Sequence, residues 1–241
     1  MKLSIIIPAF NEARVIENCV QCAADAVRLN SNPGFEGEIV VVDNNSTDQT
    51  AELAGQAGAK VVFEPHNQIA RARNAGAQAA TGDWLLFLDA DTLLPPETLA
   101  DALAEMARGD IVGGTSILNY GRPPLRARPF VMLCNFAIRR LKMTAGCFLF
   151  CRGDVFRDLN GFDETFYAGE DAEFGKVLKR LARQRRMSVA ILHRHPPLTS
   201  DRKFRQHGLR GVLLAVARYI FLPKHTMRDK RHLDIFYGER K

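Results

Sequence analysis

The feature that most constrains the fold is a regular alternation of short apolar runs and longer, helix-patterned segments along the first half of the sequence. The apolar runs are rich in Val, Ile and Leu and are predicted strands; they span residues 3–8, 38–42, 60–63 and 84–88. The segments between them are predicted helices; they span residues 11–29, 46–57, 69–80 and 95–108. Because such strands are apolar on both faces, the alternation predicts an α/β fold: a Rossmann-type, mainly parallel sheet with helices on both faces.

The second half of the chain is less regular, although the same kinds of pattern recur. We expect strands over residues 111–118, 147–151 and 189–192, and a helix over residues 170–184. We find no internal repeat or low-complexity segment, so we expect a single domain over residues 1–241. A change in composition near residue 111 and a basic, helical tail divide that domain into three parts, which are residues 1–110, 111–200 and 201–241.

Polar clusters follow three of the predicted strands. They are Pro8-Ala9-Phe10-Asn11-Glu12, Asp43-Asn44-Asn45-Ser46 and Asp89-Ala90-Asp91. In open α/β sheets, ligands bind beyond the carboxyl ends of the strands. We therefore expect the three clusters to line one site.

Asp89 and Asp91 are the most informative of these residues. Two carboxylates one residue apart at the end of a strand face the same side, and without a cation their repulsion would force one to take a proton. A hard divalent ion such as Mn²⁺ or Mg²⁺ resolves this conflict, since it prefers carboxylate and phosphate oxygens and can stabilise a leaving diphosphate. The alternative interpretation is a turn acid and a capping acid ahead of the helix predicted from residue 95.

Further short motifs accompany the acidic pair in a definite order. They are Ser4–Glu12, Val40–Thr50, Ala70–Gly76, Ala80–Trp84 running into Leu88–Asp91, and Asn160–Glu164 leading to Gly169–Asp171. In this order and spacing, across residues 3–181, the motifs resemble those of the family 2 glycosyltransferases, which have the nucleotide-binding GT-A fold. The resemblance implies that residues 1–110 form a nucleotide-sugar-binding half and residues 111–200 an acceptor half.

The resemblance also implies a set of donor-side residues that would bind a UDP- or GDP-linked sugar. The set comprises Pro8, Phe10, Glu12, Asp43, Arg73, Asn74, Asp89, Ala90 and Arg202. Glu12 would lie near the ribose or base, Asp43 would accept a hydrogen bond from the base, and Arg202 would contact phosphate. The alternative for Glu12 and Asp43 is a helix N-terminal charge, which the helix dipole favours.

The metal ligands implied by the resemblance are Asp91 and a histidine near the last predicted strand. Neutral imidazole can ligate a divalent ion, and some relatives use a histidine from this region. His193 and His195 share one strand face, and we favour His193. The alternative is a surface turn ahead of Pro196-Pro197.

The acceptor side would be organised around Asp171. In the family, the second acid of this Glu170-Asp171 pair removes a proton from the acceptor hydroxyl, which attacks the anomeric carbon opposite the leaving nucleoside diphosphate and inverts its configuration. An ordinary Asp pKa of about 3.9 makes a weak base at neutral pH, so burial beside Glu170 would be needed to raise it. Gly146 is assigned to the same side. The alternative is that both acids simply favour the N-terminus of a helix.

Charge and composition limit the partners. The formal net charge of +6 suits a phosphorylated substrate, a nucleic acid or an anionic membrane surface, but no nucleic-acid motif accompanies the basic tail, so we expect no nucleic acid partner. Five cysteines with no secretory signal, and no apolar run of roughly 18 residues, indicate a cytoplasmic protein without a membrane span.

Two stretches with basic flanks, residues 129–141 and 209–222, are amphipathic, and the whole of residues 111–153 lacks Asp and Glu. Peripheral contact with the inner face of a membrane is one interpretation. Ordinary packing of helices onto the sheet and binding of a phosphorylated acceptor are the alternatives.

The leading hypothesis is therefore an inverting, Mn²⁺- or Mg²⁺-assisted glycosyltransferase acting on a nucleoside-diphosphate sugar and an unidentified acceptor hydroxyl. The alternative is a non-catalytic nucleotide-sugar-binding protein, which would have no need of Asp171. A nucleotidyltransferase is disfavoured, because residues 8–12 lack the Gly-rich loop with Lys that would hold a triphosphate.

Overall fold

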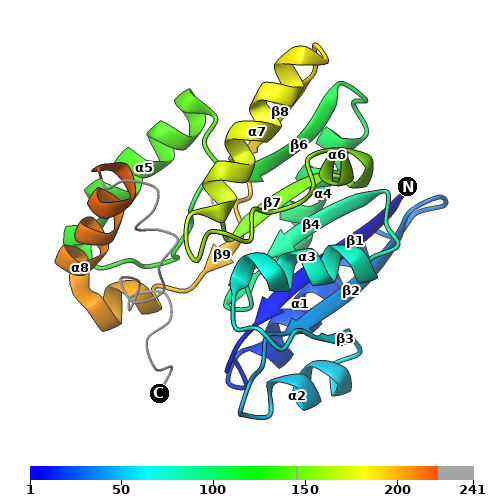
Figure 1. Cartoon of the computed structure of the whole chain (residues 1–241), viewed down its shortest axis with the longest axis horizontal. Helices are drawn as coiled ribbons and strands as arrows, with labels where there is room; N and C mark the ends of the chain where they lie inside the picture. The colour runs from blue at the N-terminus through cyan, green and yellow to red at the C-terminus, as the bar shows by residue number, and fades with distance from the viewer. Residues whose placement is uncertain (145, 222–241) are drawn as a thin grey trace.

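A seven-stranded sheet runs through the centre of the computed structural model, which describes residues 1–144 and 146–221 (Figure 1). Its strands are β1 (Lys2–Ala9), β2 (Glu36–Asp43), β3 (Lys60–Phe63), β4 (Trp84–Leu88), β6 (Ile111–Ser116), β7 (Phe148–Arg152) and β8 (Ser188–Leu192). Their order across the sheet is β3-β2-β1-β4-β7-β6-β8. β7 is antiparallel to β4 and β6, and the other pairs of this sheet are parallel.

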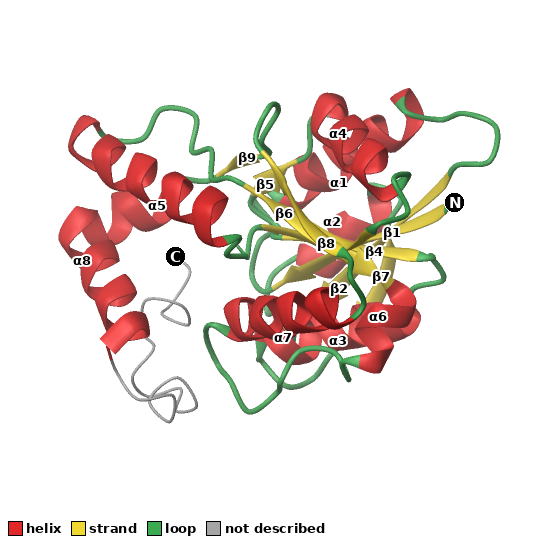
Figure 2. Cartoon of the chain, turned by 90° about the horizontal axis from the view of Figure 1, so that it is seen from above, coloured by secondary structure: helices red, strands yellow, loops and turns green. Residues whose placement is uncertain are grey.

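Helices cover both faces of the sheet (Figure 2). One face carries α1 (Ile16–Leu29), α2 (Thr50–Gln56) and α4 (Pro96–Met106), and the other carries α3 (Ile69–Ala79), α6 (Gly153–Asp158) and α7 (Glu170–Gln184). The two apolar clusters share β1, because Ile5 and Ile7 point into one and Ile6 into the other. This two-sided burial explains why the strands are uniformly apolar, and the predicted fold class is confirmed.

Two helices begin later than the sequence predicts, and the reason is local. Asn11 has a positive φ of 52° and cannot lie in a helix, and Asn45, just before the second predicted helix, also has a positive φ of 66°. Their loops instead bind each other: the Asn11 amide donates to Ser46 Oγ over 3.0 Å, and Thr47 N donates to Asn11 Oδ1 over 2.8 Å. The polar side chains that resembled helix caps therefore join the ends of β1 and β2.

A second, two-stranded sheet was not predicted. It pairs β5 (Thr92–Leu93) with β9 (Leu198–Thr199) in antiparallel register, with Thr92 opposite Thr199. The two threonine hydroxyls are hydrogen bonded over 3.0 Å and are buried. This pairing carries the start of the C-terminal helix to the carboxyl end of β4, beside the acidic pair.

Two helices lie to one side of the sheet (Figure 2). α5 (Arg128–Leu141) follows a short 3₁₀ turn, η1 (Leu125–Ala127), and α8 (Arg202–Phe221) is kinked at Gly208, where φ is 61° and ψ 175°. The amphipathic stretch predicted over residues 129–141 is α5, and the stretch over residues 209–222 lies in α8 as far as residue 221. The rest of the predicted tail, residues 222–241, lies outside the described residues. None of the helices described here combines the length and hydropathy needed to cross a membrane.

Candidate active site

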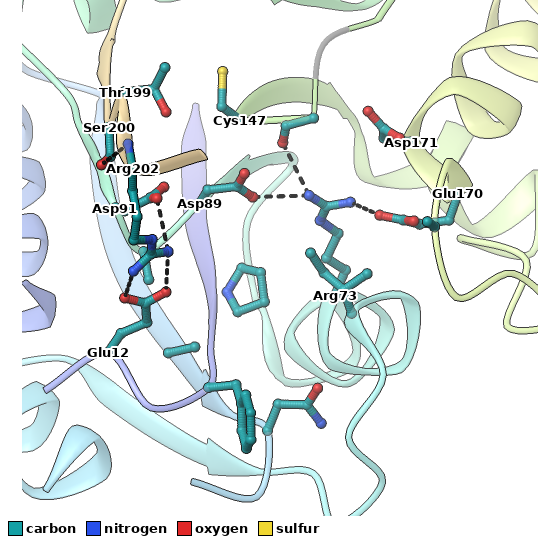
Figure 3. Close-up of a pocket in the computed structure, with 18 of the residues that line it drawn as sticks. Glu12, Arg73, Asp89, Asp91, Cys147, Glu170, Asp171, Thr199, Ser200 and Arg202 are labelled. Atoms are coloured by element: carbon teal, nitrogen blue, oxygen red, sulfur yellow. Dashed lines mark hydrogen bonds and ion pairs between the residues drawn. The ribbon is translucent and has the colours of Figure 1, made fainter. Parts of the chain in front are cut away.

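A cavity of about 270 Å³ opens at the carboxyl ends of β1 and β4 (Figure 3). The N-terminal turns of α3 and α7 and the segments before α8 complete its wall. Eleven of the fourteen residues predicted for the site line it, namely Pro8, Phe10, Glu12, Arg73, Asp89, Ala90, Asp91, Gly146, Glu170, Asp171 and Arg202. The strand-end rule thus locates the cavity, and the geometry within it divides into two charged clusters.

The first cluster, the Arg202 cluster, consists of Arg202, Glu12 and Asp91. The Arg202 guanidinium donates two parallel hydrogen bonds of 2.8 Å to the Glu12 carboxylate and a third of 3.0 Å to Asp91 Oδ2. The hydrogen bond to Glu12 is the main reason that the pKa of Arg202 is raised, and the charge of Asp91 adds to it. Ser200 N donates to the Asp91 backbone oxygen over 3.1 Å, which fixes this segment against the end of β4.

The second cluster, the Arg73 cluster, consists of Arg73, Asp89, Glu170 and Asp171. Arg73 Nη2 donates to Asp89 Oδ1 over 3.0 Å, and Nη1 donates to the Glu170 carboxylate. Burial alone would lower the pKa of Arg73, but the charges of Glu170, Asp89 and Asp171 outweigh it and the pKa is raised. One buried guanidinium therefore connects the acid that ends β4 with the acids that begin α7.

Glu170 is the strongly perturbed carboxyl of this cluster. Its burial raises the pKa to about 7; the positive charge of Arg73 acts against this rise, and the negative charges of Asp171 and Asp89 add to it. Glu170 and Asp171 also stand in the first turn of α7, where the helix dipole favours negative charge. The alternative interpretation, that both acids only complement the N-terminus of a helix, therefore agrees with their position in α7. It does not account for the fact that both residues also line the cavity.

Gly146 provides room for the Asp171 carboxyl. A Cβ atom at this position would lie 2.7 Å from Asp171 Oδ2, closer than such atoms normally approach. The Gly146 carbonyl accepts a hydrogen bond of 3.1 Å from Arg73 Nη2, and the Thr144 hydroxyl donates to the Asp171 backbone oxygen over 2.9 Å. The segment after α5 is thus bonded to both Arg73 and Asp171.

Three predicted residues are not brought to the cavity. Asp43 Oδ1 accepts a hydrogen bond of 3.0 Å from Ser46 N and holds the loop after β2. The Asn74 side chain exchanges hydrogen bonds of 2.9 Å with the backbone of Phe162, so it holds the loop before α7.

His193 is the third. It is exposed and follows β8, the strand at the far edge of the sheet, where it lines a different cavity with Arg108 and Arg139. It does not line the cavity that contains Asp91, so its role as a metal ligand stays a prediction.

Several lining residues were not predicted. They include Asn67, Ile69, Tyr120, Tyr167 and Ser200. Asn44 of the second predicted polar cluster does line the cavity, and its side-chain amide bonds backbone groups of residues 64, 66 and 68. Tyr120 and Tyr167 come from irregular segments that carry no pattern.

The carboxylates at the end of β4 are suited to bind a divalent cation together with the diphosphate of a substrate. Asp91 and Asp89 offer hard carboxylate oxygens, and their side chains are 17% and 28% exposed at the cavity. Within residues 1–144 and 146–221 no group of three or more His, Cys, Asp or Glu could hold a metal by itself. Mg²⁺ is commonly bound by only one or two carboxylates with substrate phosphates and water, so the donor set is adequate once a diphosphate is present.

The chain is similar in sequence to curated glycosyltransferases. Glycosyltransferase AglE of Haloferax volcanii is 29% identical over 186 residues, which cover 72% of this chain and 60% of that protein. The undecaprenyl-phosphate 4-deoxy-4-formamido-L-arabinose transferase of Pseudomonas fluorescens is 33% identical over 159 residues, which cover 61% of this chain and 45% of that protein. The matched regions thus span less than two thirds of the length of either relative.

Solved structures share the fold. The mannosyltransferase PcManGT from Pyrobaculum calidifontis, in complex with GDP-Man and Mn²⁺, has a TM-score of 0.65 at 19% identity and covers 97% of this chain and 68% of its own. S. aureus TarS 1–349, in complex with UDP-GlcNAc, has a TM-score of 0.63 at 23% identity and covers 82% of this chain and 57% of its own. A family model described as Glycosyl transferase family 2 matches residues 4–157. Since that match extends over more than half of the sequence, the chain belongs to glycosyl transferase family 2.

Proposed function

We propose that the protein is an inverting glycosyltransferase that moves a sugar from a nucleoside-diphosphate sugar to an acceptor hydroxyl, with help from Mn²⁺ or Mg²⁺. The observation that carries the proposal is the single cavity in which buried Arg73 joins Asp89 to Glu170, with Asp171 beside them. The complexes of TarS with UDP-GlcNAc and of PcManGT with GDP-Man and Mn²⁺ support the same class of donor.

The proposed step is a direct displacement at the anomeric carbon. The acceptor oxygen forms a bond to that carbon while the bond between the carbon and the diphosphate oxygen breaks. The hydroxyl proton passes to the Asp171 carboxylate, and the electron pair leaves with the nucleoside diphosphate. Attack from the face opposite the leaving group inverts the configuration.

The donor end supplies positive charge for the leaving group. A divalent ion held by Asp91, with Asp89 beside it, would neutralise charge that develops on the diphosphate. Arg202 presents a planar donor pair that matches phosphate geometry, and at present those donors are engaged with Glu12 and Asp91. We therefore expect Arg202 to exchange these carboxylates for phosphate oxygens when the donor binds.

The acceptor end orients the base. Arg73 binds Glu170, and Glu170 precedes Asp171 in the first turn of α7, so the position of the base depends on the Arg73–Glu170 pair. Gly146 leaves space beside Asp171 for an acceptor hydroxyl, because a side chain there would meet the carboxyl.

The test is a thermal-shift panel of UDP- and GDP-linked sugars, each with and without Mn²⁺, followed by an assay for nucleoside diphosphate release. We expect stabilisation by one donor class that is stronger with Mn²⁺, since a ligand stabilises in proportion to its occupancy. We also expect slow release of that diphosphate through transfer to water. Donor binding with no release under any acceptor would support the non-catalytic alternative, and no donor binding at all would overturn the proposal.

A further inference from the structure

The outer face of α5 is an exposed apolar surface. Its apolar side chains are Met132, Leu133 and Phe136, which are 71%, 65% and 62% exposed; Leu125 of the preceding turn and Leu141 at the end of the helix are 74% and 62% exposed. Large apolar side chains scattered singly over a surface are normal, but these lie close together along one helix and the turn before it. We define this group, with the cations described below, as the α5 surface.

Among the residues that the structure describes, the packing of α5 does not require these side chains. The opposite side of the helix carries Val131 and Ile138, which are buried, and Val131 packs in a cluster with Phe204 of α8. Asn135 fastens the helix as well, since its amide accepts from Leu118 N and donates to Leu118 O, both over 2.8 Å. The structural face of α5 is therefore complete, and the apolar outer face needs another explanation.

Positive charge surrounds the apolar side chains. Exposed cations stand before, within and after the helix; they are Arg122, Arg126, Arg128, Arg139, Arg140 and Lys142. No Asp or Glu occurs anywhere in residues 111–153, so the segment contains no acid to neutralise them. Apolar side chains between basic ends are the pattern of a helix that lies in a membrane interface.

We propose that the α5 surface binds an anionic lipid bilayer, with Met132, Leu133 and Phe136 inserted among the acyl chains. Arg139, Arg140 and the other cations would meet lipid phosphates, because long basic side chains keep their charged ends at the headgroup level. Each cation near an anionic leaflet strengthens binding by about fivefold, so six of them and a small apolar face together suffice for reversible attachment.

Charge favours a bilayer over a second copy of the chain as the partner of this surface. In a symmetric dimer the same patch meets itself, so the arginines of one α5 surface would face those of the other. That arrangement opposes like charges with no acid from the segment between them. An anionic membrane provides the opposite charge.

A short segment of chain connects the α5 surface to the acceptor end of the cavity. Only residues 142–145 separate α5 from Gly146, whose carbonyl binds Arg73, and Thr144 binds the Asp171 backbone. Attachment through α5 would thus hold the acceptor end of the cavity close to the lipid headgroups. This consequence is independent of whether the protein transfers a sugar.

The experiment is vesicle co-sedimentation of the full chain. It compares phosphatidylcholine vesicles with vesicles that contain about 30% phosphatidylglycerol. The key variant combines M132Q, L133Q and F136Q, since glutamine keeps helix propensity. The matched control combines L29Q and F63Q, which remove apolar side chains that are 61% and 60% exposed on α1 and β3. We expect wild type and control to bind anionic vesicles and the key variant to bind at least about tenfold more weakly.

A fluorescence measurement separates insertion from loose adhesion. Trp84 is the sole tryptophan and is buried, so F136W and F63W each add one exposed reporter. Vesicles should shift the F136W emission to shorter wavelength and leave F63W unchanged. Failure of wild type to bind anionic vesicles at low salt, or equal binding by the folded key variant, would overturn the proposal. So would light scattering that shows a wild-type dimer, lost in the key variant, without any vesicle binding.

Discussion

The two charged clusters of the cavity are built from the same chemistry and differ in how firmly their arginine is held. Arg73 has a side chain only 3% exposed and reaches its carboxylates from the middle of the fold. The Arg202 side chain is 29% exposed and comes from the first residue of α8, beyond the two-residue strand β9. The comparison indicates that Arg73 is a permanent part of the structure, whereas Arg202 can be displaced by a ligand.

The largest expected difference between the clusters is in catalysis, because the proposed base, Asp171, belongs to the Arg73 cluster. We expect D171N to lower the rate of sugar transfer by about 10²- to 10⁴-fold while donor affinity changes little, because the amide cannot accept the hydroxyl proton. The measurement is turnover alongside calorimetric donor titration. E173Q is the matched control, since it removes an equal charge from the same first turn of α7 and should retain transfer. Equal losses in both variants would reduce Asp171 to a helix N-terminal charge.

Arg73 should dominate stability. R73M leaves the buried Glu170 and the partly buried Asp89 without their shared cation, and we expect the free energy of unfolding to fall by about 3–5 kcal/mol. In the same helix, Arg71 is 35% exposed and pairs with Glu64 and Glu164, so R71M should lower that free energy by about 1 kcal/mol or less. Urea unfolding of both variants tests this difference. Similar losses would show that Arg73 is no more embedded than a surface residue.

Arg202 should control ligand affinity in two opposite directions. R202M removes a cation from Asp91 and Glu12, so Mn²⁺ alone should bind the donor-free variant about tenfold more tightly than wild type. The same variant lacks a charge-assisted phosphate contact, and donor affinity should fall by about 10- to 100-fold. Titration calorimetry with Mn²⁺ and with the donor found by screening measures both. R205M is the control, because Arg205 is 70% exposed and pairs with Asp201 instead.

The contrast between the clusters also explains how far the sequence could predict the site. Glu12, Asp89 and Asp91 follow strongly apolar strands. Because that apolar pattern is local in the sequence, the ends of these strands can be predicted from it. The pairing of Arg202 with Glu12 joins residues 190 positions apart and depends on the two-residue strands β5 and β9. Strands that short carry no periodicity, so neither they nor the cluster they create could be foreseen.

His193 illustrates the complementary limit. The strand before His193 was predicted correctly. The order of the strands across the sheet, however, cannot be predicted from local sequence patterns. β8 pairs with β6 at the edge of the sheet, and the histidine after it lies at another cavity. Similarly, the helical pattern includes Asn11, yet its φ is positive and its backbone N–H donates to Ser46 of the loop after β2, a contact between segments that no local pattern predicts.

The smallest expected effect is a pH dependence that belongs to the Arg73 cluster. Burial raises the folded-state pKa of Glu170 to about 7 from an ordinary value of 4.5. Between these pH values the folded chain binds more protons at Glu170 than the unfolded chain does. The free energy of unfolding should therefore decrease as pH rises from 4.5 to 7.

E170Q tests this dependence, because glutamine resembles the protonated acid and does not titrate. The pH slope of the unfolding free energy between pH 4.5 and 7 should flatten in E170Q and persist in E173Q. If the slope is the same in both, Glu170 is ionised throughout and Arg73 holds it as a full ion pair. In that case the acceptor end would resemble the Arg202 cluster in charge and would differ from it only in burial.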